Sequence, residues 1–144
     1  MENITKEMIL QQLKRHEGCV LHPYRDHIGY LTIGYGRLID TALDGGISQD
    51  EADLMLSNDF DKYLAEAQKV KVFEKLNNAR KAVIISMIFN LGLPRFLLFK
   101  NFIRAMEKDN FSQASSEMLS SKWAKQVGKR AVELALQMEK GVWS

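Results

Sequence analysis

Cysteine, proline and long apolar runs are scarce in this chain of 144 residues. Cys19 is the only cysteine, so an intramolecular disulfide cannot form and an all-thiolate zinc site is excluded. No run of about 18 uninterrupted apolar residues occurs, which argues against a membrane-spanning helix. The composition, 46% hydrophobic and 26% charged, excludes disordered and collagen-like chains and predicts one globular domain with its own core.

The sequence also lacks an export signal at its start and a strong net charge. Its first residues mix charges into the apolar positions and contain no small-residue cleavage site, so we expect synthesis in the cytoplasm without secretion. The net charge of +2 is unevenly divided, with +1 over 1–39, −7 over 40–66, +6 over 67–107 and +2 over 108–144. The basic second half favours an anionic partner, although a solvated face explains most of these lysines and arginines more simply.

Hydrophobic spacing predicts a mostly helical chain. Helices are predicted at 4–16, 48–69, 79–91, 96–107, 112–120 and 128–140. The segment 79–91 is apolar nearly all round after its first turn, so we expect it to be the buried centre of the helical lobe. Ser48 and Glu51 have the spacing of a capping box at the start of the second segment. Gly92 and Gly141 each follow a predicted helix at the position where glycine usually ends one.

The segment between residues 18 and 40 has a different character. Glycines alternate there with β-forming residues, which predicts short strands joined by turns, one of them at Asp26–Gly29. We therefore predict one domain over 1–144 of the α+β, mostly helical class. A small sheet lobe at about 18–46 is joined by a long helix at about 48–69 to a helical lobe at about 70–144, which also includes the N-terminal helix.

Two carboxylates occupy different local settings in this scheme. Glu17 follows the first predicted helix, and Asp26 lies nine residues on in a glycine-marked turn. Glycoside hydrolysis needs such a pair, one carboxyl that delivers a proton and one that is ionised. Because the chain has 18 acidic residues, such a pair by itself is more often ordinary surface.

The residues around this pair carry a more specific pattern, made of Glu17-Gly18, Tyr24-Arg25-Asp26 and the run GYLTIGYG at 29–36. It resembles the lysozymes of T-even bacteriophages and their relatives, glycoside hydrolase family 24. Residues 76–92 are similar to the central helix of that family, and the segment from Ser121 to Trp143 is similar to its C-terminal part. The resemblance covers nearly the whole chain and implies a lysozyme-like fold.

The resemblance implies roles for particular residues. Glu17 matches the general acid, Asp26 the second carboxylate, and Thr32 a residue that helps Asp26 position the attacking water. Substrate contacts fall on Leu38, just past the sheet, and on Phe89, at the end of the central helix. Packing explains Phe89 nearly as well. Most threonines are explained as β-branched strand residues, but within this motif the functional role of Thr32 is favoured.

Two arginines also match positions of interest. Arg130 matches an arginine that pairs with the catalytic glutamate in the family. Arg37 stands where T-even lysozymes have histidine, so an ion pair at that position would not titrate near neutral pH. The three histidines lack the spacing of metal ligands, and neither a metal nor another cofactor is expected.

The function that the resemblance implies is that of an endolysin, a muramidase that cleaves the bond between N-acetylmuramic acid and N-acetylglucosamine in bacterial peptidoglycan. We expect a monomer with no nucleic-acid partner and no stable membrane insertion, held in the host cytoplasm until a holin opens the way to the cell wall or periplasm. One alternative is a lytic transglycosylase, against which Asp26 and Thr32 argue because that reaction can proceed with one acid. The other is a non-enzymatic basic module that binds DNA or an anionic surface and needs no carboxylate.

Overall fold

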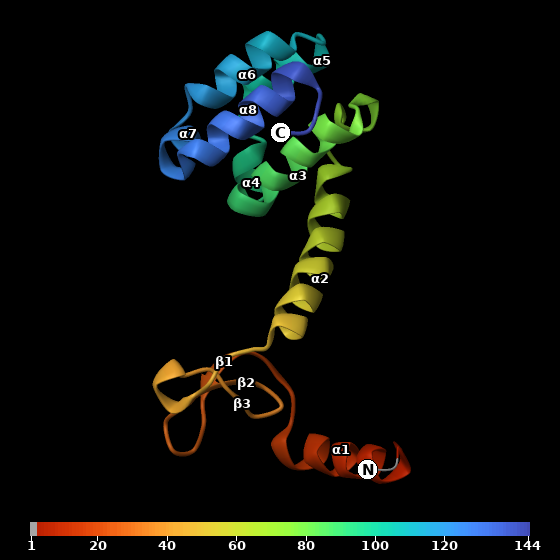
Figure 1. The fold of residues 1–144 in the computed structure, drawn as a ribbon, viewed down its shortest axis with the longest axis vertical. Coiled ribbons are helices and arrows are strands. Elements are labelled where there is room, and N and C mark those ends of the chain that lie inside the picture. The colour runs from red at the N-terminus through yellow and green to blue at the C-terminus, as the bar shows by residue number, and fades with distance from the viewer. Residues whose placement is uncertain (1–2) are drawn as a thin grey trace. The chain divides into compact units, whose positions relative to one another are not determined.

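The computed structural model describes residues 3–144, with side chains from residue 6 onward. Within this range the chain forms eight α-helices and a three-stranded antiparallel sheet (Figure 1). The mostly helical α+β class predicted from the sequence is confirmed. The chain divides into two compact units, Met1–Met55 and Leu56–Ser144, and the boundary falls inside helix α2.

The first unit contains the sheet. Its elements are α1 (Asn3–Glu17), β1 (Val20–Arg25), β2 (Leu31–Gly34), β3 (Arg37–Leu38), a 3₁₀ turn (Thr41–Leu43) and the start of α2 (Gln49–Ala67). The strands follow the order β1-β2-β3, and Thr32 on the central strand faces Tyr24 on one side and Leu38 on the other. The predicted N-terminal helix and the short strands between 18 and 40 are confirmed.

Helix α2 begins as the sequence predicts. The N–H of Glu51 donates to Ser48 Oγ at 3.2 Å, and the N–H of Ser48 donates to Glu51 Oε1 at 2.8 Å. These two reciprocal bonds satisfy amides that have no partner inside the helix. The predicted capping box is therefore confirmed, and it fixes where the helix leaves the sheet region.

The second unit is helical. After a 3₁₀ turn (Phe73–Lys75) it contains α3 (Asn78–Leu91), α4 (Leu93–Phe96), α5 (Lys100–Glu107), α6 (Phe111–Leu119), α7 (Lys122–Val127) and α8 (Lys129–Lys140). The helices predicted at 79–91, 112–120 and 128–140 are confirmed. The predicted helix at 96–107 begins too early, because residues 97–99 form an apolar turn that periodicity cannot distinguish from helix. Helix α7 was missed, since its six residues are too few for a periodic signal.

The hydrophobic core lies in the second unit. Every buried apolar side chain in the described part of the chain falls between Ala67 and Met138. Helix α3 supplies the centre with Val83, Ile84, Met87 and Ile88, none of which is exposed. The other side of α3 is partly open, with Phe89 43% exposed, so the expectation of burial all round the helix is wrong there.

Polar side chains fix α8 against α3. Buried Gln137 donates from Nε2 to the carbonyl of Ala79 at 2.7 Å, and Arg80 donates from Nε to the carbonyl of Met138 at 2.7 Å. These bonds hold Phe89 and Arg130, which α3 and α8 carry, within one unit. No helix in the described range 3–144 is both long and apolar enough to cross a membrane. That the N-terminal helix belongs to the helical lobe stays a prediction.

Candidate active site

A tight turn holds Asp26 between β1 and β2. Its Oδ1 accepts the N–H groups of Ile28, Gly29 and Tyr30, each at 2.9 Å. The chain can fold back this sharply because Gly29 adopts a positive φ of 101°. The turn predicted at Asp26–Gly29 is therefore confirmed, and it presents a carboxylate with one oxygen fully engaged by the backbone.

This turn also sets the ionisation of Asp26. The amide of Tyr30, followed by the amides of Ile28 and Gly29 and the nearby charge of His27, lowers the pKa of Asp26 below its ordinary value of 3.8, and burial opposes this only in part. Amide donors favour the charged form because they bind the carboxylate more strongly than the neutral acid. Asp26 is thus a carboxylate at neutral pH, as the second carboxylate of a glycosidase must be.

Thr32 is tied to the same turn. Its Oγ1 donates to the carbonyl of Tyr30 at 2.8 Å, and that carbonyl also accepts the N–H of Asp26 at 2.9 Å. Thr32 is 3% exposed and is the one buried residue among the described side chains of the first unit. Since its single proton goes to Tyr30, the hydroxyl can act toward a further partner only as an acceptor.

Glu17 is the last residue of α1 and is exposed. The helix ends there because Gly18 takes a positive φ of 67° and donates its N–H to the carbonyl of Lys14 at 3.0 Å. The carboxylate of Glu17 lies against Gly36, in the turn between β2 and β3. Glu17, Asp26 and Thr32 thus all belong to the first unit.

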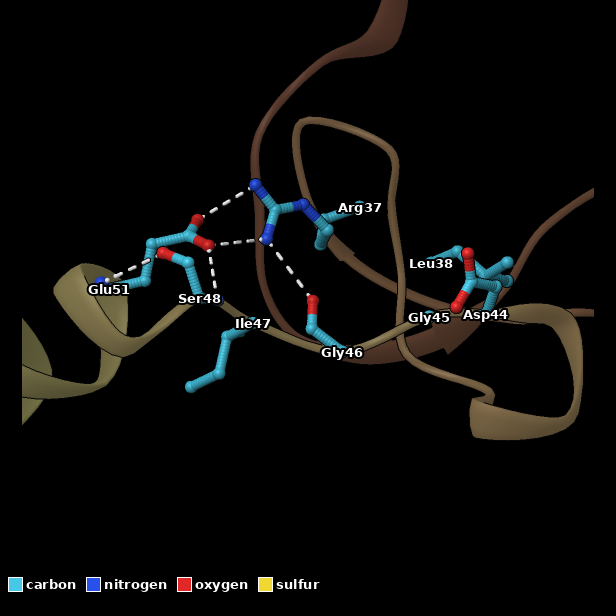
Figure 2. A pocket seen from close by; sticks show the side chains of 8 residues that line it. All are labelled: Arg37, Leu38, Asp44, Gly45, Gly46, Ile47, Ser48 and Glu51. Carbon is cyan, nitrogen blue, oxygen red and sulfur yellow. Dashed lines mark hydrogen bonds and ion pairs between the residues drawn. The ribbon is translucent and has the colours of Figure 1, made fainter.

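Leu38 lies in β3, opposite Thr32, and not past the sheet as expected. The short β3 pairing extends the sheet by two residues that the glycine-rich sequence did not reveal. Leu38 lines a depression of about 420 Å³ (Figure 2). Its burial is intermediate, which leaves part of the side chain accessible.

An ion pair stands beside Leu38 in this depression. Figure 2 shows Arg37 and Glu51 facing each other through two bonds, Nη2 to Oε2 at 2.7 Å and Nη1 to Oε1 at 2.8 Å. The bond from Arg37 and the N–H of Ser48 lower the pKa of Glu51 to about 2, while Glu51 raises the pKa of Arg37. Both shifts lie away from neutral pH, in the direction expected of a pair formed by Arg37.

Phe89 and Arg130 come together in the second unit. Both line a pocket of about 470 Å³ between α2, α3 and α8, together with Glu133. The ring of Phe89 packs edge-on against Tyr63, with centroids 5.2 Å apart. Phe89 therefore has one packed side and one accessible side, which fits both readings of this residue. The pairing of Arg130 with Glu17 stays a prediction.

Sequence reasoning missed three contributors to these sites. The peptide group of Tyr30 joins Asp26 to Thr32, but a backbone group leaves no mark in residue type. Glu51 was recognised as a capping residue and not as the partner of Arg37. Gly36 was noted only as part of a motif. The turn between β2 and β3 brings it close to Glu17, the predicted acid. In the described part of the chain, no three histidine, cysteine, aspartate or glutamate side chains cluster as metal ligands.

Comparison with known proteins assigns a family to this arrangement. The phage lysozyme family model matches residues 14–138, a range that contains every predicted site residue. Probable T4-type lysozyme 1 of Dictyostelium discoideum is 28% identical over 92% of this chain and 94% of its own length. The endolysin of Acyrthosiphon pisum secondary endosymbiont phage 1 is 29% identical over 82% of this chain and 80% of its own.

A third relative is much longer. The pre-baseplate central spike protein Gp5 of Enterobacteria phage T4 is 26% identical over 88% of this chain but only 26% of its own length.

The chain belongs to the phage lysozyme family. It is a lysozyme-type glycoside hydrolase, and the alternative of a non-enzymatic basic module is set aside.

Proposed function

We propose that this lysozyme acts as an endolysin, which hydrolyses the β-1,4 bond between N-acetylmuramic acid and N-acetylglucosamine in peptidoglycan and so lyses the host cell. The observation that carries the proposal is the turn in which backbone amides bind the carboxylate of Asp26 beside Thr32, in the segment matched by the phage lysozyme family. The sequence similarity to a phage endolysin supports the same role.

In the proposed reaction Glu17 and Asp26 divide the proton transfers. Glu17 gives its proton to the glycosidic oxygen as the bond from that oxygen to the anomeric carbon breaks. A water molecule attacks the anomeric carbon, and its proton passes to Asp26. One bond is cleaved and one water is consumed, so no cofactor is needed.

Thr32 and Asp26 are suited to hold that water. The hydroxyl of Thr32 already donates to Tyr30, and Oδ1 of Asp26 already accepts three amides. A water that donates to Thr32 Oγ1 and to Asp26 Oδ2 keeps a lone pair for the sugar. This arrangement favours direct attack by water and inversion of configuration.

The remaining site residues would act on the substrate or on the acid. Leu38 and Phe89 each keep an accessible surface, which supports a role in contacting sugar rings. Arg130 would pair with the carboxylate of Glu17, as its match to the arginine of the family implies. We further propose a monomer that waits in the host cytoplasm and reaches the cell wall after a holin opens the membrane.

Replacement of Glu17 by glutamine tests the acid. An amide cannot deliver the proton, so we expect Glu17→Gln to fold normally and to lose roughly 10²–10⁴-fold or more of its activity. Lysis is followed by turbidity of outer-membrane-permeabilised bacteria, and folding by circular dichroism. Glu7→Gln, which removes another exposed carboxylate of α1, is the matched control and should retain activity.

Two results would contradict the proposal. Lysis at the normal rate by well-folded Glu17→Gln would remove Glu17 from the reaction. An anhydro-muramic product without incorporated water would identify a lytic transglycosylase, because that reaction closes the sugar on itself.

A further inference from the structure

Gly36 occupies a position where two independent constraints require glycine. It lies in the turn between β2 and β3 with a positive φ of 71°, a conformation that other residues rarely adopt. In addition, a Cβ at Gly36 would stand 2.7 Å from Oε2 and 3.1 Å from Cδ of Glu17. The first constraint concerns the backbone alone, whereas the second concerns the side chain of the proposed acid.

The pairing of the strands creates this contact. Val20, the first residue of β1, pairs with Gly34 at the end of β2, which brings the end of α1 beside the turn that follows β2. A second contact has the same origin, since Nζ of Lys14 lies 5.8 Å from the ring centroid of Tyr35. The last turn of α1 therefore meets the glycine turn through both Lys14 and Glu17.

The steric clash of a Cβ at Gly36 would be relieved by movement of the Glu17 side chain. A separation of 2.7 Å is too short for a carbon and an oxygen that are not bonded, so one of them must shift. The atom nearest to this Cβ belongs to the end of the flexible Glu17 side chain, while Gly36 lies in a turn between two paired strands. Substitution would thus displace the carboxylate far more than the backbone.

We infer that Gly36 is a positioning residue for Glu17: the missing side chain provides the space in which the carboxylate stands. The inference rests on the proposed function of Glu17 as general acid. A proton donor must lie within hydrogen-bond reach of the leaving oxygen, and a displacement of about 1 Å can cost roughly 10²-fold in rate. The absence of a Cβ at this position therefore contributes directly to turnover.

Gly34, the last residue of β2, provides a matched control next to the same turn. Its φ of 70° is nearly that of Gly36, but a Cβ there would meet nothing within 4 Å. Gly34→Ala and Gly36→Ala therefore place alanine at nearly the same positive φ, and only the second reaches Glu17. We expect Gly36→Ala to lower kcat by roughly 10²-fold relative to Gly34→Ala with little change in KM, after correction for the folded fraction.

A spectroscopic readout separates positioning from a general loss of structure. The ¹³C shift of the Glu17 carboxyl carbon should change in Gly36→Ala and remain near the wild-type value in Gly34→Ala. In the wild-type protein an NOE should join the α protons of Gly36 to the γ protons of Glu17, a measurement that needs no variant to fold.

The outcomes distinguish this inference from the proposed function. If the NOE is absent, or if both alanine variants show the same kcat and the same carboxyl shift, Gly36 does not position Glu17, even when Glu17→Gln is inactive. If Glu17→Gln is fully active, the proposed acid itself is wrong. A low kcat confined to Gly36→Ala, with the carboxyl shift changed, supports the inference.

Discussion

Asp26 closes a turn and is also the proposed second carboxylate of the reaction. Its Oδ1 closes the turn through three amides, and these bonds also keep the group ionised. In Asp26→Asn the side-chain oxygen still accepts the amides, but the negative charge is lost. We expect the fold to persist and turnover to fall by roughly 10²–10⁴-fold, measured on permeabilised cells and on soluble glycan.

Asp40 offers a control for this substitution. It likewise closes a turn through one carboxylate oxygen, which accepts the N–H of Ala42 at 2.9 Å. Asp40→Asn should retain full activity. An equal loss in both variants would show that turn stability, and not the charge of Asp26, limits the rate.

The proposed role of Thr32 predicts the stereochemistry of the product. If Asp26 and Thr32 hold a water opposite the leaving group, the carboxyl groups stand roughly 6.5–9.5 Å apart and the new anomer is inverted. Direct attack by Asp26 on the sugar needs a separation nearer 5 Å and retains configuration. We expect proton NMR of the first-formed anomer to show inversion.

Thr32→Val tests the hydroxyl itself. Valine preserves the shape of this buried side chain but removes the proposed acceptor of the water, so turnover should fall while the circular dichroism spectrum is unchanged. Retained configuration, or full activity of Thr32→Val, would overturn the proposed role of water held by Thr32.

The start of α2 combines a helix cap with an ion pair. The carboxylate of Glu51 accepts two bonds from Arg37 and also accepts the N–H of Ser48, which caps the helix. These contacts lower the pKa of Glu51 from 4.5 to about 2. A carboxyl whose pKa is depressed in the folded state stabilises the protein above its unfolded pKa, and this contribution is lost as the pH falls through the folded pKa. The relevant window therefore runs from about 4.5 down to about 2.

We expect Glu51→Gln to lower the melting temperature at neutral pH. Near pH 2 the melting temperature of the variant should approach that of the wild-type protein. Arg37→Gln should show the same pH dependence, and the double variant should lose less than the sum of the two. Both groups are exposed, so high salt should reduce the difference. A difference that is the same at pH 2 and at pH 7 would assign the loss to something other than the ion pair.

The helices and strands were largely predictable because local signals mark their ends. The capping box at Ser48 and the glycines after α3 and α8 act within a few residues, and the structure confirms them. The errors fall where local signals are weak. The turn at 97–99 is apolar like its neighbours, and the six residues of α7 are too few for a helical period.

The sequence singled out the residues of the candidate site but did not reveal their contacts. Spacing and motif identified Asp26 and Thr32, yet the bonds that join them run through the backbone of Tyr30. Arg37 and its partner Glu51 are separated in the sequence by a loop that contains Gly45 and Gly46, so no periodicity relates the two residues. Contacts of this kind depend on the path of the chain between the elements, which residue type alone does not encode.

The distribution of charge along the chain favours binding to an anionic substrate. Residues 67–144 contain most of the basic side chains, and those on α7, Lys122 and Lys125, are exposed. Some others are already paired, as Lys75 is with Asp109 at 3.3 Å. A bacterial wall is anionic, so unpaired lysines would raise the local concentration of enzyme on it.

We expect lysis to slow steeply as salt rises, because exposed charges are screened beyond about 8 Å at physiological ionic strength. Cleavage of a neutral chitooligosaccharide should change much less. The double variant Lys122→Gln and Lys125→Gln should flatten the salt dependence of lysis more than Lys75→Gln does, since Lys75 is already neutralised by Asp109. Equal salt dependence on the wall and on the neutral oligosaccharide would remove the basic surface from substrate binding and leave recognition to uncharged contacts such as Leu38 and Phe89.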